Sequence, residues 1–283
     1  MLDGKRAVIT GGGRGIGKAI AGALARKGAA LLLISRTESE LAAARAELVK
    51  AVAKVEMAAL DVAGSAAPDE IKKAIERVFP DGIDILVTAA GIYGPIGPVV
   101  ELDAKLWKQA IDVNLFGTFA AIQAAVPAMK KRGGGKIITF SGGGDGAYPR
   151  FSAYVASKGG VVRLTETLAS ELAEFRIDIN AIAPGPVNTR FLEELLAAGP
   201  ERAGKETYEK SLAQKEEGGV PPEKVAELVL FLASSASDGI SGKLISAVRD
   251  NYAGFPDHRD EIMNSDVYNV RRIKPKDRGF DWQ

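Results

Sequence analysis

Tyr154 and Lys158 are a pair of residues whose types and spacing suggest chemistry, in the segment Tyr154-Val155-Ala156-Ser157-Lys158. A spacing of four places both side chains on one face of a helix. A tyrosine alone has a pKa of about 10 and is a poor acid–base catalyst at neutral pH. An ammonium within about 4–6 Å can lower that pKa by about 1–3 units. The pair is therefore a candidate general acid and base, although the same spacing is common on ordinary amphipathic helices.

A glycine-rich segment, residues 10–17, reads Thr-Gly-Gly-Gly-Arg-Gly-Ile-Gly and lies between an apolar run and a helical pattern. Glycines at these positions permit a tight turn and let backbone N–H groups approach a pyrophosphate at the helix N-terminus. The first strand–helix unit of a parallel sheet is the place where such a loop binds a dinucleotide. Cofactor contacts are accordingly predicted for Gly11, Arg14, Gly15, Ile16 and Gly17.

The residues that follow the second predicted strand bear on the choice between NAD and NADP. NAD sites carry an acidic side chain there for the ribose 2′-hydroxyl, but this chain has Ser35 and Arg36. Arg36 and Arg14 would bind a 2′-phosphate bidentately, with no carboxylate there to repel it. Asp61 and Val62, at the end of the third strand, are placed to contact the adenine. NADP is therefore predicted, the alternative being an Arg36 that is merely solvated.

The bulk composition excludes several classes of site. The 37 basic and 36 acidic residues give a net charge of +1, so nothing favours nucleic acid or an anionic membrane as partner. No run approaches the ~20 apolar residues of a membrane span, and the N-terminus enters an apolar strand at once, leaving no room for a signal peptide. A cytoplasmic protein is expected. With no cysteine and one histidine, His258, thiol chemistry is excluded and no metal site is expected.

Short apolar runs alternate with longer helical patterns along the chain. Strands are predicted at 7–10, 30–35, 55–61, 83–88, 136–141, 176–182 and 243–247. Helices are predicted at 15–27, 38–52, 69–79, 104–132, 152–175 and 222–234. This alternation predicts a doubly wound (Rossmann) α/β fold with a parallel seven-stranded sheet covered on both faces. We expect one catalytic domain, 1–249, with a helical lid insertion at 190–220 and a C-terminal extension at 250–283.

Together these segments resemble the short-chain dehydrogenase/reductase family, in its single-domain branch. The resemblance rests on the glycine loop, Asn114, Ser141 and the pair Tyr154/Lys158. Ser141 precedes Tyr154 by 13 residues and Asn114 precedes Ser141 by 27, spacings like those of the family. The segment 184–189, Pro-Gly-Pro-Val-Asn-Thr, is similar to the family's Pro-Gly-x-x-x-Thr element beside the nicotinamide.

The resemblance implies a reversible reduction of a ketone or aldehyde to an alcohol. Tyr154 would be the general acid in reduction and the general base in oxidation. Lys158 would lower the Tyr154 pKa and bind the nicotinamide ribose. Ser141 would hydrogen-bond the substrate oxygen, and Asn114 would hold a water that relays protons. The remaining cofactor positions implied by the resemblance are Ala90, Gly91, Pro184, Gly185, Val187 and Thr189.

The family also implies partners. These are a small carbonyl or alcohol substrate and further copies of the chain, with a homotetramer favoured over a dimer. The helices that begin at Ala104 and Ser152 resemble those that pair between subunits. Their outward faces are expected to carry Phe116, Phe119 and Leu164, together with Leu168.

The chain departs from the family pattern in three places within or after the matching residues 3–249. Residues 88–91 read Thr-Ala-Ala-Gly where members usually carry Asn-Asn-Ala-Gly. Residues 142–146 read Gly-Gly-Gly-Asp-Gly, which could admit a bulky substrate or form a mobile loop. The usual Asp-Gly-Gly ending is replaced by 246–250, Ser-Ala-Val-Arg-Asp, and the extension.

Two other functions remain open. A sugar-nucleotide epimerase or dehydratase also uses Tyr-x-x-x-Lys, but its loop has the spacing Gly-x-x-Gly-x-x-Gly, which Gly11, Gly15 and Gly17 do not fit. A catalytically silent NADP-binding sensor or scaffold would have no need of the four predicted catalytic side chains.

Loops and the tail are expected to shape the substrate pocket. The rim residues predicted from their loops are Tyr93, Tyr148, Arg150, Phe151, Arg190 and Phe191. The extension has 13 charged residues in 34 but also many aromatic and aliphatic ones. Disordered segments are poor in such side chains. The tail is therefore predicted to dock on a folded surface, of its own or a neighbouring subunit, and to help close the active site.

Overall fold

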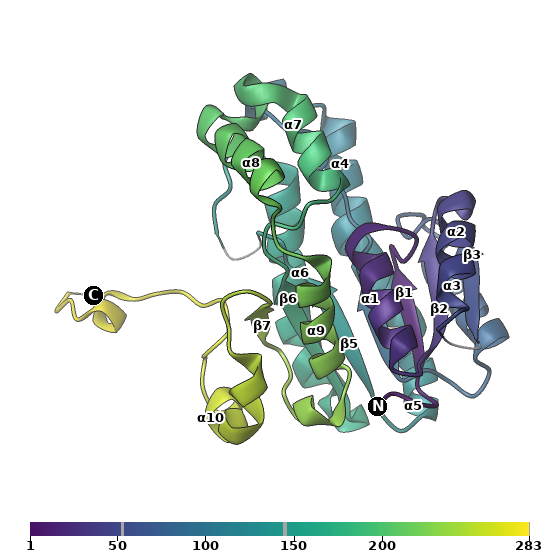
Figure 1. The fold of residues 1–283 in the computed structure, drawn as a ribbon. Helices are drawn as coiled ribbons and strands as arrows, with labels where there is room; N and C mark the ends of the chain where they lie inside the picture. Colours follow the sequence, from purple (N-terminus) through teal and green to yellow (C-terminus); the bar gives the residue numbers. More distant parts are fainter. Residues whose placement is uncertain (52–53, 144–145, 283) are drawn as a thin grey trace.

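The computed structural model describes residues 1–51, 54–143 and 146–282. Seven parallel strands form one sheet in the order β3-β2-β1-β4-β5-β6-β7 (Figure 1). The strands are β1 (Arg6–Thr10), β2 (Ala30–Ser35), β3 (Val55–Ala59), β4 (Ile85–Thr88), β5 (Gly135–Phe140), β6 (Ile177–Ala183) and β7 (Leu244–Ser246). The predicted doubly wound sheet is confirmed. The strand order reverses between β1 and β4, where the carboxyl ends of the strands open a crevice for ligands.

Helices cover both faces of the sheet. One layer contains α1 (Gly15–Arg26), α2 (Glu38–Leu48) and α9 (Pro222–Leu232). The other contains α3 (Ala67–Val78), α5 (Gly117–Lys131) and α6 (Ser152–Leu172). Strand residues such as Leu32 and Leu33 face opposite layers and are fully buried. This two-sided burial explains why the strands are continuous apolar runs. Helix α2 is shorter than the predicted 38–52, and residue 52 lies outside the described residues.

The predicted single helix 104–132 is wrong in its middle. The segment consists of α4 (Ala104–Ile111), a π-helical turn η2 (Asp112–Phe116) and α5. Asp103 caps α4, because its carboxylate accepts hydrogen bonds from the first backbone N–H groups of the helix. Widened turns of this kind often mark functional positions, and this one contains Asn114.

The same helical segment is apolar enough to be compared with a membrane span. In the described part of the chain, Ala104–Lys131 has the length and a mean hydropathy of 1.3 that such a span requires, yet 56% of its apolar window is buried in the fold. It packs against α3 and α6. Its hydropathy is therefore that of a core helix.

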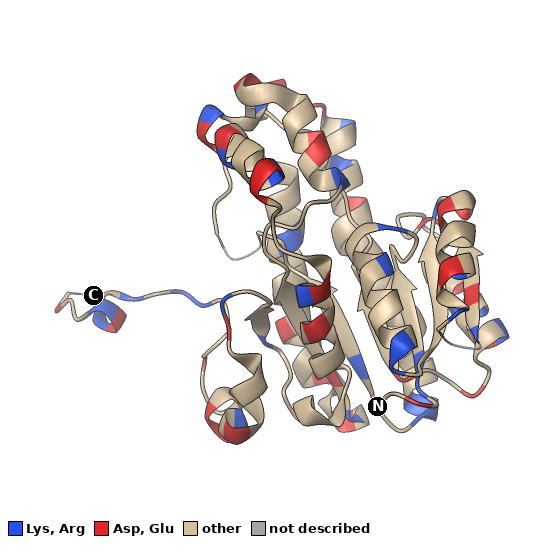
Figure 2. Cartoon of the chain, in the orientation of Figure 1, with Lys and Arg blue, Asp and Glu red and all other residues tan. Residues whose placement is uncertain are grey.

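Two helices occupy the predicted lid insertion. They are α7 (Arg190–Ala203) and α8 (Lys205–Glu217), which pack on each other above the carboxyl ends of the strands (Figure 1). Gly199, at φ 74°, kinks α7 before Pro200, and Gly218 ends α8 in the left-handed conformation. Figure 2 shows acidic and basic residues interspersed along α8. The short 3₁₀ turns elsewhere are η1 (Val99–Glu101), η3 (Ala173–Phe175) and η4 (Ser235–Ser237).

The C-terminal extension docks on the fold as far as residue 270. It forms η5 (Tyr252–His258) and α10 (Arg259–Met263). Phe255 and Ile262 are buried, and the Phe255 ring lies against Phe231 of α9. The Leu244 N–H of the edge strand β7 donates to the carbonyl of Tyr268 at 2.8 Å. The tail therefore completes the core beside α9 and β7.

Two charged side chains of the main fold hold the tail backbone. The Lys243 ammonium donates to the carbonyls of Ser265 and Val267, each at 3.0 Å. The Glu166 carboxylate accepts the Val270 N–H at 3.0 Å.

Beyond this point the chain leaves the body of the molecule as an arm that contains η6 (Pro275–Arg278) (Figure 1). Its Ile273, Phe280 and Trp282 are exposed, so these apolar side chains do not dock on their own subunit.

Two truncations separate the docked tail from the arm. Ending the chain after Asp250 removes Phe255 and Ile262, and at about 1.5–3 kcal/mol for each buried side chain we expect the free energy of unfolding to fall by about 3–6 kcal/mol. Ending it after Val270 should leave that free energy nearly unchanged. Urea denaturation of both variants measures the difference. Equal stability of the two would contradict the docking described above.

Candidate active site

Two neighbouring cavities lie at the carboxyl edge of the sheet. The first, about 210 Å³, is lined by the glycine loop, the end of β2 and the residues after β3, and is called the loop cavity. The second, about 720 Å³, contains Tyr154 and Lys158 and is called the catalytic cavity. Lining residues common to both are Ile16, Ala89, Gly91, Thr189 and Phe191. A ligand as long as a dinucleotide would extend from one cavity into the other.

The glycine loop has the geometry of an anion cradle. Gly11 has φ 71°, and a β-carbon there would lie 2.7 Å from the Ala90 nitrogen. A β-carbon on Gly17 would collide with the Gly11 carbonyl. Helix α1 begins directly after the loop with no side-chain cap, so its first N–H groups are available to a phosphate. These residues fit a bound pyrophosphate. Only glycine at positions 11 and 17 allows the backbone segments of the loop to lie this close together.

The end of β2 offers both a hydroxyl and a cation to the loop cavity. Within the described part of the chain, the buried Ser35 hydroxyl has no hydrogen-bond partner, which suits a site that a ligand completes. Arg36 lines the cavity and is exposed. The sequence-based expectation that no carboxylate lies nearby is wrong, because Glu40 of α2 also lines the cavity. Its carboxylate binds the Arg14 guanidinium at 2.9 Å, whereas Arg190 of the same cavity pairs with Glu194 at 3.1 Å. Among the described residues, Arg36 is in neither of these ion pairs.

The remaining cofactor positions predicted from the sequence fall around these two cavities. Asp61, Val62, Ala90 and Gly91 line the loop cavity. Pro184, Gly185, Val187 and Thr189 line the catalytic cavity, with Thr189 also reaching the first.

Tyr154 and Lys158 lie on α6 and both line the catalytic cavity. The Tyr154 hydroxyl rests against the backbone of Gly142, where any β-carbon would collide with it. The Lys158 ammonium lies 5.9 Å from the centre of the Tyr154 ring and donates to the Phe140 carbonyl at 3.0 Å. The two side chains therefore share one cavity, as the spacing of four predicts.

Burial controls the ionisation of this pair. Desolvation raises the pKa of Tyr154, with a smaller contribution from the neighbouring Tyr148. Desolvation also lowers the pKa of Lys158 from 10.5 to about 8. The expected lowering of the Tyr154 pKa by Lys158 is therefore not found in this structure. The phenol is fully desolvated, and the ammonium is bonded to a backbone carbonyl rather than to the phenol.

Ser141 lies at the end of β5 but does not line the catalytic cavity. Its neighbours Phe140 and Gly142 do, whereas the Ser141 hydroxyl is fully buried and has no hydrogen-bond partner among the described residues. A buried hydroxyl without a partner is costly. Residues 144 and 145 of this glycine-rich segment lie outside the described residues.

Asn114 connects the π-helical turn to the loop after β4 and to α6. Its amide oxygen accepts the Ile92 N–H at 2.8 Å. Its amide nitrogen donates to the Ile92 carbonyl at 2.8 Å and to the Ser157 hydroxyl at 2.9 Å. Ser157 in turn donates to the Tyr154 carbonyl at 2.7 Å. Asn114 thus fixes the positions of Gly91 and Tyr154 relative to each other, and its predicted water relay stays a prediction.

Aromatic side chains form the rim of the catalytic cavity. Of the six predicted rim residues, Tyr93, Tyr148 and Phe191 line it. Phe151 is fully buried beneath them, stacked on Tyr148 at 4.1 Å between ring centres. Arg190 lines the loop cavity instead, and Arg150 lines neither cavity. From the tail, Tyr268 lines the catalytic cavity, as expected of an extension that helps to close the site.

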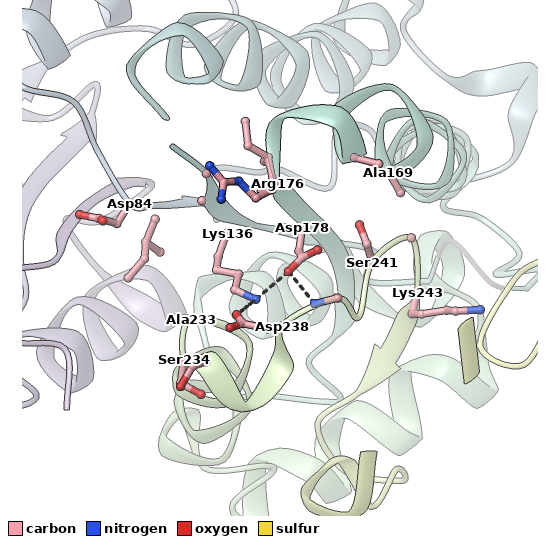
Figure 3. A pocket seen from close by; sticks show the side chains of 18 of the residues that line it. Asp84, Lys136, Ala169, Arg176, Asp178, Ala233, Ser234, Asp238, Ser241 and Lys243 are labelled. Carbon is pink, nitrogen blue, oxygen red and sulfur yellow. Dashed lines mark hydrogen bonds and ion pairs between the residues drawn. The ribbon is translucent and has the colours of Figure 1, made fainter. Parts of the chain in front are cut away.

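A further cavity, about 1040 Å³, lies at the opposite, amino-terminal edge of the sheet (Figure 3). Several of its charged side chains pair with one another. Lys136 binds Asp178 at 2.7 Å and Asp238 at 2.8 Å, and the Asp84 carboxylate accepts from Lys5 at 3.2 Å. None of the predicted catalytic residues lines this cavity, so the candidate active site is at the carboxyl edge.

Glu40 and Ser157 are two of the site residues that sequence reasoning missed. Glu40 was missed because it belongs to α2 and approaches Arg14 only through the fold. Ser157 was missed because it lies inside the Tyr-x-x-x-Lys segment as a spacer. Its position one residue before Lys158, on the buried side of α6, is the signal that could have identified it.

Comparison with known proteins agrees with this geometry. Residues 5–199 match the family described as short chain dehydrogenase. The chain is 36% identical to the 3-oxoacyl-(acyl-carrier-protein) reductase FabG of Thermotoga maritima over 247 residues, covering 86% of this chain and 96% of that protein.

Two solved structures are similar throughout the same fold. Carveol dehydrogenase from Mycobacterium avium, in complex with NAD, aligns with a TM-score of 0.76 at 28% identity, covering 87% of this chain and 96% of that one. A variant of actinorhodin polyketide ketoreductase with NADPH gives the same TM-score of 0.76, 28% identity and the same coverage of 87% and 96%. The chain therefore belongs to the short-chain dehydrogenase/reductase family of oxidoreductases.

Proposed function

We propose that this protein is an NADP(H)-dependent oxidoreductase that interconverts a small ketone and the corresponding alcohol, with Tyr154 as the general acid and base. The observation that carries the proposal is that Tyr154 and Lys158 line a cavity of about 720 Å³ that shares lining residues with the neighbouring glycine-loop cavity. This arrangement sets a proton donor beside the place where a dinucleotide would end. Relatives that act on a 3-oxoacyl group, on carveol and on a polyketide support the carbonyl–alcohol chemistry.

We assign each of these catalytic side chains a role in the proposed reaction. When bound, NADP(H) supplies or accepts the hydride. Tyr154 gives its phenolic proton to the carbonyl oxygen during reduction, and its raised pKa keeps that proton available at neutral pH. Ser141 donates to the same oxygen and stabilises the developing charge. Lys158 binds the nicotinamide ribose and stabilises the phenolate that forms.

The preference for NADP rests on Arg36. Arg36 and Ser35 both line the loop cavity, and the Ser35 hydroxyl has no hydrogen-bond partner among the described residues, so a 2′-phosphate bound there could accept from both. Glu40 holds Arg14 and places a carboxylate in the same cavity, which weakens the contribution first expected of Arg14. Relatives with NAD and with NADPH are both known, so the choice depends on these local charges.

Arg36→Ala tests the cofactor preference. At about 1.5–3 kcal/mol for a charge-assisted hydrogen bond, we expect NADPH affinity to fall roughly 10–150-fold with NADH affinity nearly unchanged. Fluorescence titration measures both. Arg190→Ala, which removes another guanidinium of the same cavity, serves as the control. Equal binding of NADH and NADPH by the wild-type protein would refute the preference.

The proposed reaction is tested by incubating the wild-type protein with NADPH and a panel of cyclic ketones, sugars, steroids and acyl thioesters. Consumption of NADPH absorbance with at least one carbonyl compound is expected. A protein that binds NADPH tightly but reduces none of them would favour the silent sensor.

We further propose a cytoplasmic homo-oligomer, with a tetramer favoured over a dimer, built from the catalytic domain 1–249 and its extension. Leu106 of α4 and Phe119 of α5 support it, since both are exposed in the single chain and are costly to leave in water together.

A further inference from the structure

Phe191 separates the two cavities of the site. It is the second residue of α7, and its side chain lines both the loop cavity and the catalytic cavity. A β-carbon placed on Gly91 would lie 3.7 Å from the tip of the Phe191 ring and 3.7 Å from the Lys158 ammonium. The ring and the ammonium therefore border the same small space beside Gly91.

Aromatic contacts hold the ring in this position. It meets Tyr93 edge-on at 4.5 Å between ring centres and lies 5.8 Å from the centre of the Tyr154 ring. Tyr93 in turn contacts Tyr154 at 4.8 Å. Edge-to-face pairs of this kind are favourable beyond the area they bury. The three rings thus form one aromatic cluster, and Phe191 is the ring of this cluster that also lines the loop cavity.

We propose that Phe191 is a gate that fills the nicotinamide subsite and must swing out before the cofactor reaches Tyr154. The inference rests on the proposed function, because a dinucleotide anchored on the glycine loop reaches Tyr154 only through the space that the ring occupies. Its adenosine half lies in the loop cavity and can bind with the gate closed. Its nicotinamide half cannot.

The chain around Phe191 allows such a movement. Gly185, at φ 77°, lies before α7 and can accommodate a backbone change. Thr189 caps the helix by accepting the Phe191 N–H at 3.3 Å, so a ligand that bonds to the Thr189 hydroxyl competes with the closed position. The far end of α7 is fixed, because Arg202 donates to the Ile96 carbonyl at 2.8 Å. Before the kink at Gly199, Leu195 is buried in the cluster with Ile96 and Phe151, so we expect movement in the first turn of α7.

The test compares the rate of NADPH association, followed by stopped-flow fluorescence, in the wild type and in Phe191→Ala. When only an open fraction of the protein can bind, removing the gate raises the apparent rate by the inverse of that fraction. We expect an increase of about tenfold or more, and a smaller one for Phe191→Leu. The affinity for adenosine 2′,5′-bisphosphate, which reaches only the loop cavity, should change less than about twofold in either variant.

Leu195→Ala is the matched control. Leu195 is buried where α7 packs on Ile96 and Phe151, so this substitution loosens the lid but leaves the ring in place. The gate would be overturned if Leu195→Ala raised the rate of NADPH association as much as Phe191→Ala does. It would also be overturned if the wild type bound NADPH and Phe191→Ala bound it no faster. If neither cofactor bound to the wild type or to Phe191→Ala, the proposed function would fail and the gate with it.

Discussion

Tyr154→Phe is expected to lower kcat for carbonyl reduction by about 10²–10⁴-fold, the usual contribution of a positioned general acid. The substitution removes only the phenolic oxygen, which lies beside Gly142 at the floor of the catalytic cavity. The loop cavity does not include Tyr154, so NADPH affinity should stay within about twofold of the wild type. Initial rates and a fluorescence titration measure the two effects separately.

The control for this prediction is Tyr148→Phe. Tyr148 carries a second phenol in the same cavity, and its loss should change kcat only a few-fold. More than about a tenth of the wild-type kcat in Tyr154→Phe would move the proton donor to another residue.

The upward shift of the Tyr154 pKa can be tested through the pH dependence of the two reaction directions. The phenol stays protonated at neutral pH, so reduction should be nearly flat between about pH 6 and 8. Alcohol oxidation, which needs the phenolate, should rise by about tenfold per pH unit. A reduction rate that falls as steeply as oxidation rises would show that the phenol titrates in this range.

Lys158→Met is expected to stabilise the folded protein at neutral pH while damaging both turnover and cofactor binding. Burial lowers the Lys158 pKa from 10.5 to about 8, so the folded state binds this proton less tightly than the unfolded chain does. The free-energy cost of burying the charged Lys158 ammonium is present in full below pH 8 and disappears as the pH rises towards 10.5. It amounts to about 3 kcal/mol at most. Urea denaturation of wild type and variant at about pH 7 and pH 10 measures it.

The stability difference between Lys158→Met and the wild type should shrink at the higher pH. Lys158→Arg is the control, since it keeps a buried cation and should not stabilise the protein. A variant Lys158→Met that unfolds more easily than wild type at about pH 7 would mean that the bond to the Phe140 carbonyl outweighs the desolvation cost.

Much of the architecture could be predicted because the local patterns are strong. Runs such as Leu31–Ile34 pair with β1 and β3 and are buried on both faces, which is what a continuous apolar strand indicates. The glycine loop could be placed in the same way, since its function depends on backbone shape and on its position after the first strand.

Features that depend on distant partners could not be read from the sequence. The π-helical turn lies in a segment with ordinary helical periodicity, and bonds from Asn114 to Ile92 and Ser157 accompany it. Glu40 looks like a solvent-facing residue of α2 until the glycine loop is folded beside it. The direction of the Tyr154 pKa shift depends on how completely α6 and its neighbours exclude water, which spacing along the helix does not reveal.

The tail that covers β7 also has a consequence for the newly made chain. An edge strand presents unpaired N–H and C=O groups that can template pairing with another molecule. The Tyr268 carbonyl accepts the Leu244 N–H of β7, and Tyr268 is synthesised after all the strands of the sheet. Until the ribosome has released the segment up to Val270, β7 lies at an unprotected edge. The apolar surface against which Phe255 and Ile262 are buried in the folded chain is then exposed to solvent. Aggregation during synthesis should therefore concentrate in chains that stop short of this segment, while longer chains escape it.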